Sequence, residues 1–362
     1  MPFKKIKNKR GDTVELQTGA ALKSRMKDIA KNDKRLSVMG DTLAREDSSL
    51  LFRAYLEDEG VTLKDAVRAL GINNLGVETV RSLYENDNTK PLFNTIIEDG
   101  IRMGFQKAGR ADQLIAKTIP IDQMTYGYYT MEDPDKEELD FKLVGQAAPI
   151  PVAVIKLDDK HTVRVYKRGS GVEITDEAKS MNIDLLQLHL QLRGQRMGRT
   201  DEYLAVERLL NGYYKDGTDA APTLGVKTAN DFKLTDMWYA GQYMQDKYGF
   251  TPKLAVMNLT TAEKWSSQKE DSGNLIFLNE LKNGQIPELV NSKPFVSDQM
   301  PDNRIMLVDT DFALAEYEYK GLSVENDRNV KTQVEGSYAS KSTDYIPFSK
   351  NARMIVNLDQ AR

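Results

Sequence analysis

The feature that most constrains the fold is an unusually long stretch of helical periodicity between Thr175 and Asn211. Thr175 is a suitable N-cap, the two acids after it favour the positive end of a helix dipole, and Asn211-Gly212 is a typical stop signal. At about 1.5 Å per residue, such a helix would be on the order of 50 Å long. This exceeds the usual globular length, so we expect a structural axis rather than one layer of a small domain.

Two rows of apolar residues follow the first half of this expected helix. Gly194 and Gly198 lie one turn apart, which allows a bend or a close neighbour. Three arginines recur every three residues and suit the acids of a neighbouring chain, nucleic acid, or a solvated face with local ion pairs. The rows are Ile183, Leu186, Leu190 and Leu185, Leu188, Leu192, and the arginines are Arg193, Arg196 and Arg199.

The residue types offer little catalytic chemistry. The chain has no cysteine, which excludes disulfides, thiolate nucleophiles and cysteine metal sites. Its two histidines, His161 and His189, lack the spacing of metal ligands. We expect His161 to be a plain strand residue and His189 to be a packed or interface residue. GSG at Gly169–Gly171 lacks the rest of a phosphate-loop motif and is interpreted as a strand-to-helix turn. We therefore predict a protein that is not an enzyme, with no cofactor and no metal site.

Charge is concentrated in two segments, although the formal net charge is only -4, which argues against the whole chain being a nucleic-acid binder. The basic N-terminus suits a flexible solubilising tail, a protein contact or, less favourably, a phosphate backbone. The acidic run suits a solvated tip, a cation or a basic partner, and we expect it to meet basic residues of a neighbouring subunit. These candidate contacts are Lys4, Lys5, Lys7, Lys9 and Arg10, and Glu132, Asp133, Asp135, Glu137, Glu138 and Asp140.

Neither a secretory signal nor a membrane span is indicated. The basic N-terminus is followed by no apolar core, and no window approaches eighteen apolar residues. We expect a soluble protein made in a cytoplasm.

Along the chain we expect helices first, then strands, and then a region in which helices and strands are mixed. Helical periodicity covers 20–30, 42–57, 62–70, 77–84 and 92–106, with Asp41 and Thr62 as N-caps. Strands are expected at 119–130, 141–144, 152–157 and 161–167, with roughly 130–165 forming a two-stranded excursion. After the long helix we expect helices at 234–248 and 260–268 (with a Thr cap), a helix and loop over 274–290, and strands at 253–258, 294–297, 304–309, 314–319, 322–326 and 353–358.

This order of elements resembles the major capsid proteins of tailed bacteriophages. The stretches that carry the resemblance are VGQAAPIP, VYKRGSGVEITDEA, AVERLLNGYYKDGT and KLAVMNLTTAEKW, within residues 110–362. The first is similar to the approach to the family's extended loop, the next two bracket its spine helix, and the fourth is similar to an axial-domain strand and helix.

The resemblance implies an α+β protein with the Hong Kong 97-type capsid fold. It would comprise a long spine helix, peripheral and axial domains, an extended β-hairpin loop and a helical N-terminal arm. The peripheral domain would be 111–130, 163–221 and 313–362, with the spine helix at 175–211. The extended loop would be 131–162, and the axial domain 222–312.

The implied function is structural. Copies of the chain would assemble as pentamers and hexamers into an icosahedral phage head around double-stranded DNA. Portal and scaffolding proteins would be partners, with a decoration protein as an optional addition. An encapsulin-like cargo compartment is the alternative, and a soluble α+β enzyme or binding module is the third hypothesis. Assembly would occur in the host cytoplasm and leave the protein in the virion.

Residues 1–110 depart from the simplest family pattern. We expect them to be retained as a helical arm that contacts neighbours, whereas the alternative is an internal scaffold segment that a protease removes. Some members form Lys–Asn crosslinks, and the loop contains Lys136, Lys142, Lys156 and Lys160. We expect no crosslinking here, because a lysine alone is not sufficient.

Overall fold

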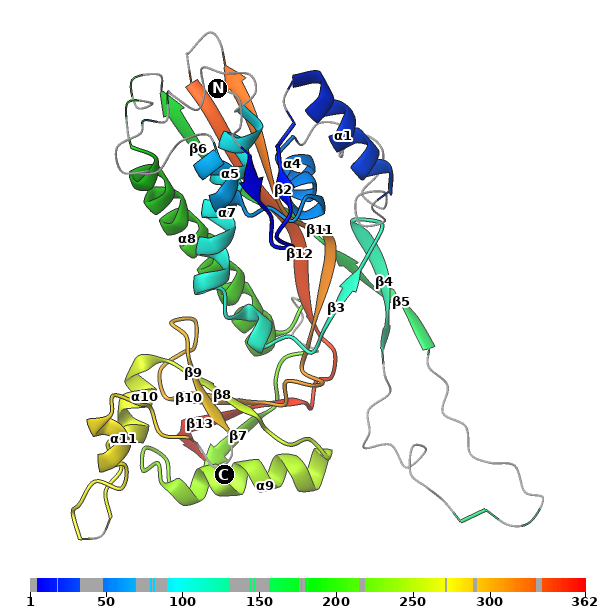
Figure 1. The fold of residues 1–362 in the computed structure, drawn as a ribbon. Helices are drawn as coiled ribbons and strands as arrows, with labels where there is room; N and C mark the ends of the chain where they lie inside the picture. The colour runs from blue at the N-terminus through cyan, green and yellow to red at the C-terminus, as the bar shows by residue number, and fades with distance from the viewer. Residues whose placement is uncertain are drawn as a thin grey trace. The chain divides into compact units, whose positions relative to one another are not determined.

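The computed structural model forms two compact units (Figure 1). Unit 1 comprises Met1–Gly109, Arg168–Gly198 and Leu322–Lys341, and unit 2 comprises Arg110–Lys167, Arg199–Gly321 and Ser342–Arg362. Three long elements contribute to both units: helix α8 (Ile183–Asn211) and strands β11 (Leu314–Asn329) and β12 (Val334–Pro347). The structure describes residues 5–17, 19–32, 48–69, 79, 81, 90–130, 143–144, 146, 156–175, 177, 180, 182–214, 219–270, 272–288, 292–329 and 334–362.

Unit 1 contains the helices expected from the N-terminal periodicity. They are α1 (Gly19–Asn32), α4 (Ser48–Asp58), α5 (Leu63–Ala69) and α7 (Lys90–Ala108), preceded by the short strands β1 (Ile6–Lys7) and β2 (Thr13–Val14). Thr62 caps α5 as expected, because its hydroxyl accepts a 3.1 Å hydrogen bond from the Asp65 amide. The expected cap Asp41 and most of the expected helix at 77–84 lie outside the described residues.

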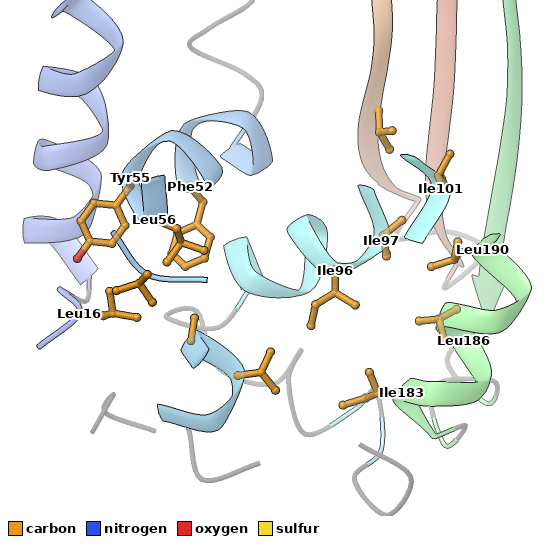
Figure 2. Close-up of a cluster of buried hydrophobic side chains, with 14 of the residues drawn as sticks. Leu16, Phe52, Tyr55, Leu56, Ile96, Ile97, Ile101, Ile183, Leu186 and Leu190 are labelled. Atoms are coloured by element: carbon orange, nitrogen blue, oxygen red, sulfur yellow. The ribbon is translucent and has the colours of Figure 1, made fainter. Parts of the chain in front are cut away.

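The apolar faces of these helices meet in one core (Figure 2). The first apolar row of α8 packs toward α7, while α4 contributes aromatic and aliphatic side chains on the other side of the cluster. The N-terminal helices therefore share a hydrophobic core with the first half of the long helix. The labelled members of this core are Leu16, Phe52, Tyr55, Leu56, Ile96, Ile97, Ile101, Ile183, Leu186 and Leu190.

Helices α7 and α8 touch backbone to backbone through glycines. A Cβ atom added at Gly104 would lie 2.1 Å from the Gln191 carbonyl oxygen, and one at Gly194 would lie 2.0 Å from the Ile101 carbonyl oxygen. Gly198 is also restricted, because its added Cβ would lie 2.7 Å from the Phe105 carbonyl oxygen. The expectation that Gly194 and Gly198 admit a close neighbour is confirmed, and that neighbour is α7.

The expected start of the long helix at Thr175 is wrong. Helix α8 begins at Ile183, where the Leu186 amide donates to the Asn182 carbonyl, and Thr175 instead ends strand β6 (Lys167–Thr175). The β-branched residues of GVEIT favour a strand, and that strand has β12 as its neighbour in the sheet. With 29 residues, α8 is about 44 Å long.

The GSG stretch is not a strand-to-helix turn, because Gly169–Gly171 lies inside β6. A Cβ at Gly169 would lie 3.1 Å from the Ala339 carbonyl oxygen, and one at Gly171 would lie 2.5 Å from the Tyr338 ring. Both glycines therefore leave room for residues of β12.

The sheet that contains β6 has the strand order β3-β11-β12-β6. Strand β3 (Lys117–Pro120) pairs in parallel with the first residues of β11, with Lys117 opposite Ala315. The two strands expected at 314–319 and 322–326 are one continuous strand, and β12 was missed in the sequence. The central stretch SYASKST of β12 lacks a regular alternation of apolar and polar residues.

A separate two-stranded ribbon precedes β6. It pairs β4 (Thr125–Thr130) with β5 (Lys156–Arg164), with Thr125 opposite Arg164. The single strand expected at 119–130 is therefore two strands, β3 and β4, and the strand expected at 161–167 is split between β5 and β6. The break in each case lets the chain leave one sheet and join another.

Unit 2 also contains a five-stranded sheet with the order β7-β13-β10-β8-β9. Trp265 is fully buried in its core and donates to the Pro287 carbonyl. Helix α10 is capped by Asn258, which accepts from the Thr261 amide, and not by a threonine as expected. The elements are β7 (Thr223–Val226), α9 (Leu234–Tyr248), β8 (Leu254–Met257), α10 (Leu259–Ser266), α11 (Leu278–Lys282), β9 (Lys293–Val296), β10 (Arg304–Val308) and β13 (Arg353–Ala361).

Candidate assembly surfaces

The second apolar row of α8 is uncovered in the subunit. Leu185, Leu188 and Leu192 are 46%, 54% and 50% exposed, whereas the first row on the opposite side is buried against α7. A helix turns through about 100° per residue, so these three leucines form one continuous stripe. Contiguous exposed apolar side chains of this kind are typical of interaction surfaces.

The stripe continues into basic residues toward the C-terminus of the helix. Arg196 and Arg199 lie four and seven residues after Leu192 and therefore on the same face, while Arg193 lies beside it; all three are exposed. We call Leu185, Leu188, Leu192, Arg196 and Arg199 the outer row of α8.

His189 lies beside the outer row and is exposed in the subunit. Of the two environments expected for His189, packing within the subunit is excluded, because the buried face of α8 lies on the other side, and the interface stays a prediction. His161 lies in β5, as the strand expectation required.

The acidic run from Glu132 to Asp140 lies outside the described residues, so its expected contact stays a prediction. Leu143 and Val144 follow this run closely and are described. Both are exposed, and Leu143 is fully exposed. An apolar residue that follows the acidic run closely is therefore exposed.

The basic N-terminus is folded rather than a flexible tail over its described part. Strands β1 and β2 form a small hairpin, and the Lys9 amide donates a 3.0 Å hydrogen bond to the Gly60 carbonyl at the end of α4. The basic side chains point to solvent, and Lys5 lies 3.8 Å from Glu15. Of the expected basic contacts, the structure describes Lys5, Lys7, Lys9 and Arg10 but not Lys4.

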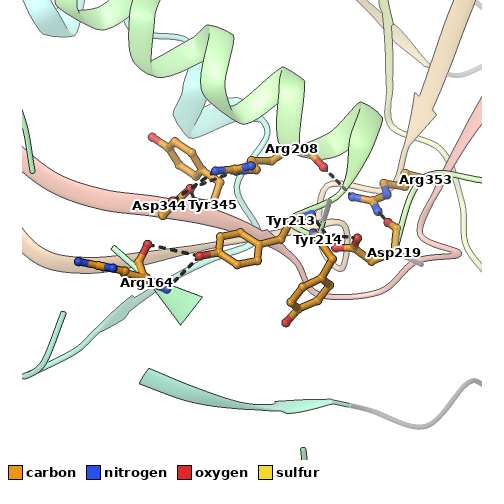
Figure 3. A network of polar contacts seen from close by, with 8 residues as sticks. All are labelled: Arg164, Arg208, Tyr213, Tyr214, Asp219, Asp344, Tyr345 and Arg353. Carbon is orange, nitrogen blue, oxygen red and sulfur yellow. Dashed lines mark hydrogen bonds and ion pairs between the residues drawn. The ribbon is translucent and has the colours of Figure 1, made fainter. Parts of the chain in front are cut away.

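The C-terminal end of α8 is held by a polar network in unit 2 (Figure 3). Arg208 donates to both carboxylate oxygens of the fully buried Asp344, at 3.2 and 3.4 Å, and lies 4.9 Å from the centre of the Tyr213 ring. Tyr213 in turn accepts from the Arg164 amide at 2.9 Å and lies 3.3 Å from the Arg164 carbonyl. The end of β5 is thereby tied to the end of the long helix.

Backbone groups at the helix end are satisfied by Asp219 and Arg353. Asp219 accepts from the amides of Tyr213 and Tyr214, at 2.6 and 3.1 Å. Arg353 donates to the Arg208 carbonyl at 3.1 Å and to the Asp219 carbonyl. Burial lowers the pKa of Arg353 to about 10, so it stays charged at neutral pH.

Arg110 is a second residue whose role was missed in the sequence. Arg110 makes a bidentate ion pair with the buried Glu202 of α8, at 2.8 and 3.0 Å. Its guanidinium group also donates to the Val296 carbonyl and lies 4.6 Å from the centre of the Phe295 ring. No spacing rule could have found this pair, because its members are 92 residues apart.

Metal-binding side chains do not come together in the part of the chain that the structure describes. No group of three or more His, Asp or Glu residues suitable for a metal occurs among those residues. Within the same residues, no helix is both long and apolar enough to cross a membrane.

Comparison with known proteins indicates what kind of protein carries these exposed surfaces. A family model described as phage capsid protein matches residues 159–349, slightly more than half of the chain, including all of α8. The chain belongs to the phage capsid protein family.

Solved structures agree with this membership at the level of the fold. The capsid protein of a native GTA particle is 15% identical, with a TM-score of 0.52 over 69% of this chain and 90% of that chain. A phage-related protein from Bordetella bronchiseptica RB50 is 11% identical, with a TM-score of 0.50 over 73% of this chain and 96% of that chain. No curated protein sequence matches this chain. The expected α+β, Hong Kong 97-type capsid fold is confirmed.

Proposed function

We propose that this chain is the major capsid protein of a tailed bacteriophage, which assembles as pentamers and hexamers into an icosahedral head around double-stranded DNA. The observation that carries the proposal is the phage capsid family match over residues 159–349. A capsid protein of this family is a shell-forming virion component, and its function requires surfaces that bind other copies rather than a catalytic site.

The surface chemistry supports this proposal. The outer row of α8 and Leu143 place apolar side chains in solvent that a stable monomer would normally bury. Closed symmetric assembly repeats each contact many times, so individually modest contacts add up to a stable container.

We propose that the long helix belongs to a peripheral domain made of 111–130, 163–221 and 313–362. Residues 131–162 are the extended loop over an adjacent subunit, and 222–312 are the axial domain. In this proposal the acidic run 132–140 and the arginines of α8 make subunit contacts.

Residues 1–110 remain in the mature subunit in this proposal. Support comes from the glycine contact between α7 and α8 and from the shared core, because removal of α7 would expose Leu186, Leu190 and the backbone at Gly194 to water. Intact mass measurement of subunits from mature particles tests this, and a mass that lacks about the first hundred residues would overturn it.

The further partners in the proposal are a portal protein and a scaffolding protein during assembly in the host cytoplasm, with a decoration protein as an optional addition. Nucleic acid is bound without sequence specificity. The first ten residues are the candidate genome contact, although Asp12 and Glu15 lie on the same hairpin and offset part of its positive charge. Subunits are not covalently crosslinked, so boiling particles in SDS should give a monomer band.

The experiment that tests the function is electron microscopy of the expressed chain, with absorbance at 260 and 280 nm. Uniform shells, formed alone or with the neighbouring genes co-expressed, are the expected result. Nucleic acid inside would support a phage head, and a packaged enzyme would instead establish an encapsulin-like compartment. Only small species, even with co-expression, would refute the shell-forming function.

A further inference from the structure

The chain changes from one sheet to another immediately after β5. Strand β5 pairs with β4 up to Arg164, which lies opposite Thr125, and the next strand, β6, belongs to the four-stranded sheet. Only Val165 and Tyr166 separate β5 from β6. A two-stranded ribbon is only marginally stable by itself, so the direction of the β4–β5 ribbon depends on what holds its base.

Both backbone groups of Arg164 are held by one side chain (Figure 3). The Tyr213 hydroxyl accepts a hydrogen bond from the Arg164 amide at 2.9 Å and donates to the Arg164 carbonyl at a longer 3.3 Å. In an antiparallel ladder, a residue of a neighbouring strand would bond the two groups in this way. The hydroxyl of Tyr213 therefore takes the place of a neighbouring strand at this single residue.

Tyr213 is itself held in place by unit 2. Its amide donates to Asp219 at 2.6 Å, and its ring centre lies 4.9 Å from the guanidinium carbon of Arg208. Arg208 is fixed in turn by its ion pair with the fully buried Asp344. A side chain that is already ordered loses little freedom when it makes a further contact. The hydroxyl is therefore a fixed point to which Arg164 is attached.

Apolar packing holds the same part of β5 but does not give it a direction. Val163 and Val165 are buried in a cluster that includes Ile121 and Tyr317, whereas Arg164 between them is exposed. Hydrophobic burial is non-directional, but hydrogen bonds require defined distances and angles. The directional part of the attachment therefore comes from Tyr213.

We infer that Tyr213 is a positioning residue for assembly, whose hydroxyl sets the direction in which the β4–β5 ribbon leaves the end of α8. With six residues, β4 is about 20 Å long, so a tilt of about 10° at its base would move its far end by about 3–4 Å. A displacement of that size is comparable with the distance between atoms in contact, and it would misplace the loop that the ribbon carries. The inference rests on the proposed function, since it requires this loop to contact an adjacent subunit.

Hydrogen exchange measured by mass spectrometry tests the attachment in Tyr213→Phe, which removes only the hydroxyl. The ring keeps its place beside Arg208, so the surrounding core should stay intact. Loss of a typical net hydrogen-bond contribution should speed exchange in peptides covering β5 by about fivefold to tenfold. Peptides covering β8 and β10 should exchange as in the wild type. Unchanged exchange in β5, or an equal increase in all these peptides, would overturn the inference.

Tyr214→Phe is the matched control. It removes a hydroxyl from the next residue, whose ring Figure 3 shows turned away from Arg164. Exchange in β5 should therefore remain at the wild-type rate in this variant. An acceleration equal to that of Tyr213→Phe would contradict the specific role of the Tyr213 hydroxyl.

Electron microscopy measures the consequence for assembly once wild-type shells have been confirmed. Tyr213→Phe should give a severalfold lower yield of uniform shells, and Tyr214→Phe should give the wild-type yield. Faster exchange in β5 together with a wild-type yield of Tyr213→Phe shells would overturn the role in assembly. If the wild-type chain forms no shells, the proposed function fails and this role fails with it, while the exchange experiment still decides whether the hydroxyl holds the ribbon.

Discussion

The backbone contact between α7 and α8 makes a sharp prediction for glycine substitutions. Gly104→Ala adds one methyl group in a helix interior, which by itself stabilises a helix by about 1 kcal/mol. The added Cβ would lie 2.1 Å from the Gln191 carbonyl oxygen, so the two helices must separate by more than about 1 Å. Overpacking against backbone costs about 3 kcal/mol, so the net effect should be about 2 kcal/mol of destabilisation.

Gly241→Ala in α9 is the matched control. It makes the same change in the interior of another helix, but its Cβ would meet only the Pro252 side chain, at 3.8 Å. The intrinsic gain then remains, and unit 2 should become more stable by about 0.5–1 kcal/mol. Both tryptophans, Trp238 and Trp265, lie in unit 2, so urea unfolding followed by tryptophan fluorescence measures this gain.

Hydrogen exchange measured by mass spectrometry reports on Gly104→Ala, because unit 1 contains no tryptophan. A loss of about 2 kcal/mol corresponds to about thirtyfold faster exchange in peptides covering α7 and the first half of α8. Unchanged or slower exchange in those peptides would refute the reasoning that this glycine is required by the close approach of the two backbones.

Three further substitutions test unit 2, each followed by tryptophan fluorescence. Asp344→Asn should lower its stability by about 2–3 kcal/mol, somewhat below the value for a fully buried pair because Arg208 is partly exposed. Asn258→Ala should cost about 1 kcal/mol, since the Thr261 amide loses its cap. Burial raises the pKa of Tyr213 above its usual value of 10. The neutral side chain therefore contributes its full stability to the fold below pH 10, and this stability is lost as the pH rises through the raised pKa. Tyr213→Phe should remove this loss of stability at high pH.

The sequence predicted the helices well where apolar residues recur at helical spacing. Helices α1, α5, α7 and α9 lie within a few residues of their expected positions. The start of α8 was placed eight residues too early, because Thr175, followed by two acids, has the chemistry of a helix start. Pairing of the preceding residues in the sheet with β12 outweighed that local signal.

Strands with many polar residues were harder to predict from the sequence. Strand β12 contains SYASKST, which lacks regular alternation, yet Ser337, Ser340, Ser342 and Thr343 are buried in it. Strand positions of this type depend on hydrogen bonding and on the neighbouring strands, which sequence periodicity does not contain. The pairs Arg110–Glu202 and Arg208–Asp344 were missed for the same reason, since each joins residues that only the fold brings together.

The two leucine rows of α8 show the limit most clearly. Periodicity identifies both rows as apolar, but it does not say which one is covered by the same chain. The glycines determine which row is covered. Gly194 and Gly198 lie on the same side of α8 as Ile183 and Leu190, and the backbone of α7 packs against that side. The row of Leu185, Leu188 and Leu192 is then left exposed in the subunit. A helix with two apolar faces, one closed by glycine contact within the subunit and one open, is suited to a protein that folds first and assembles afterwards.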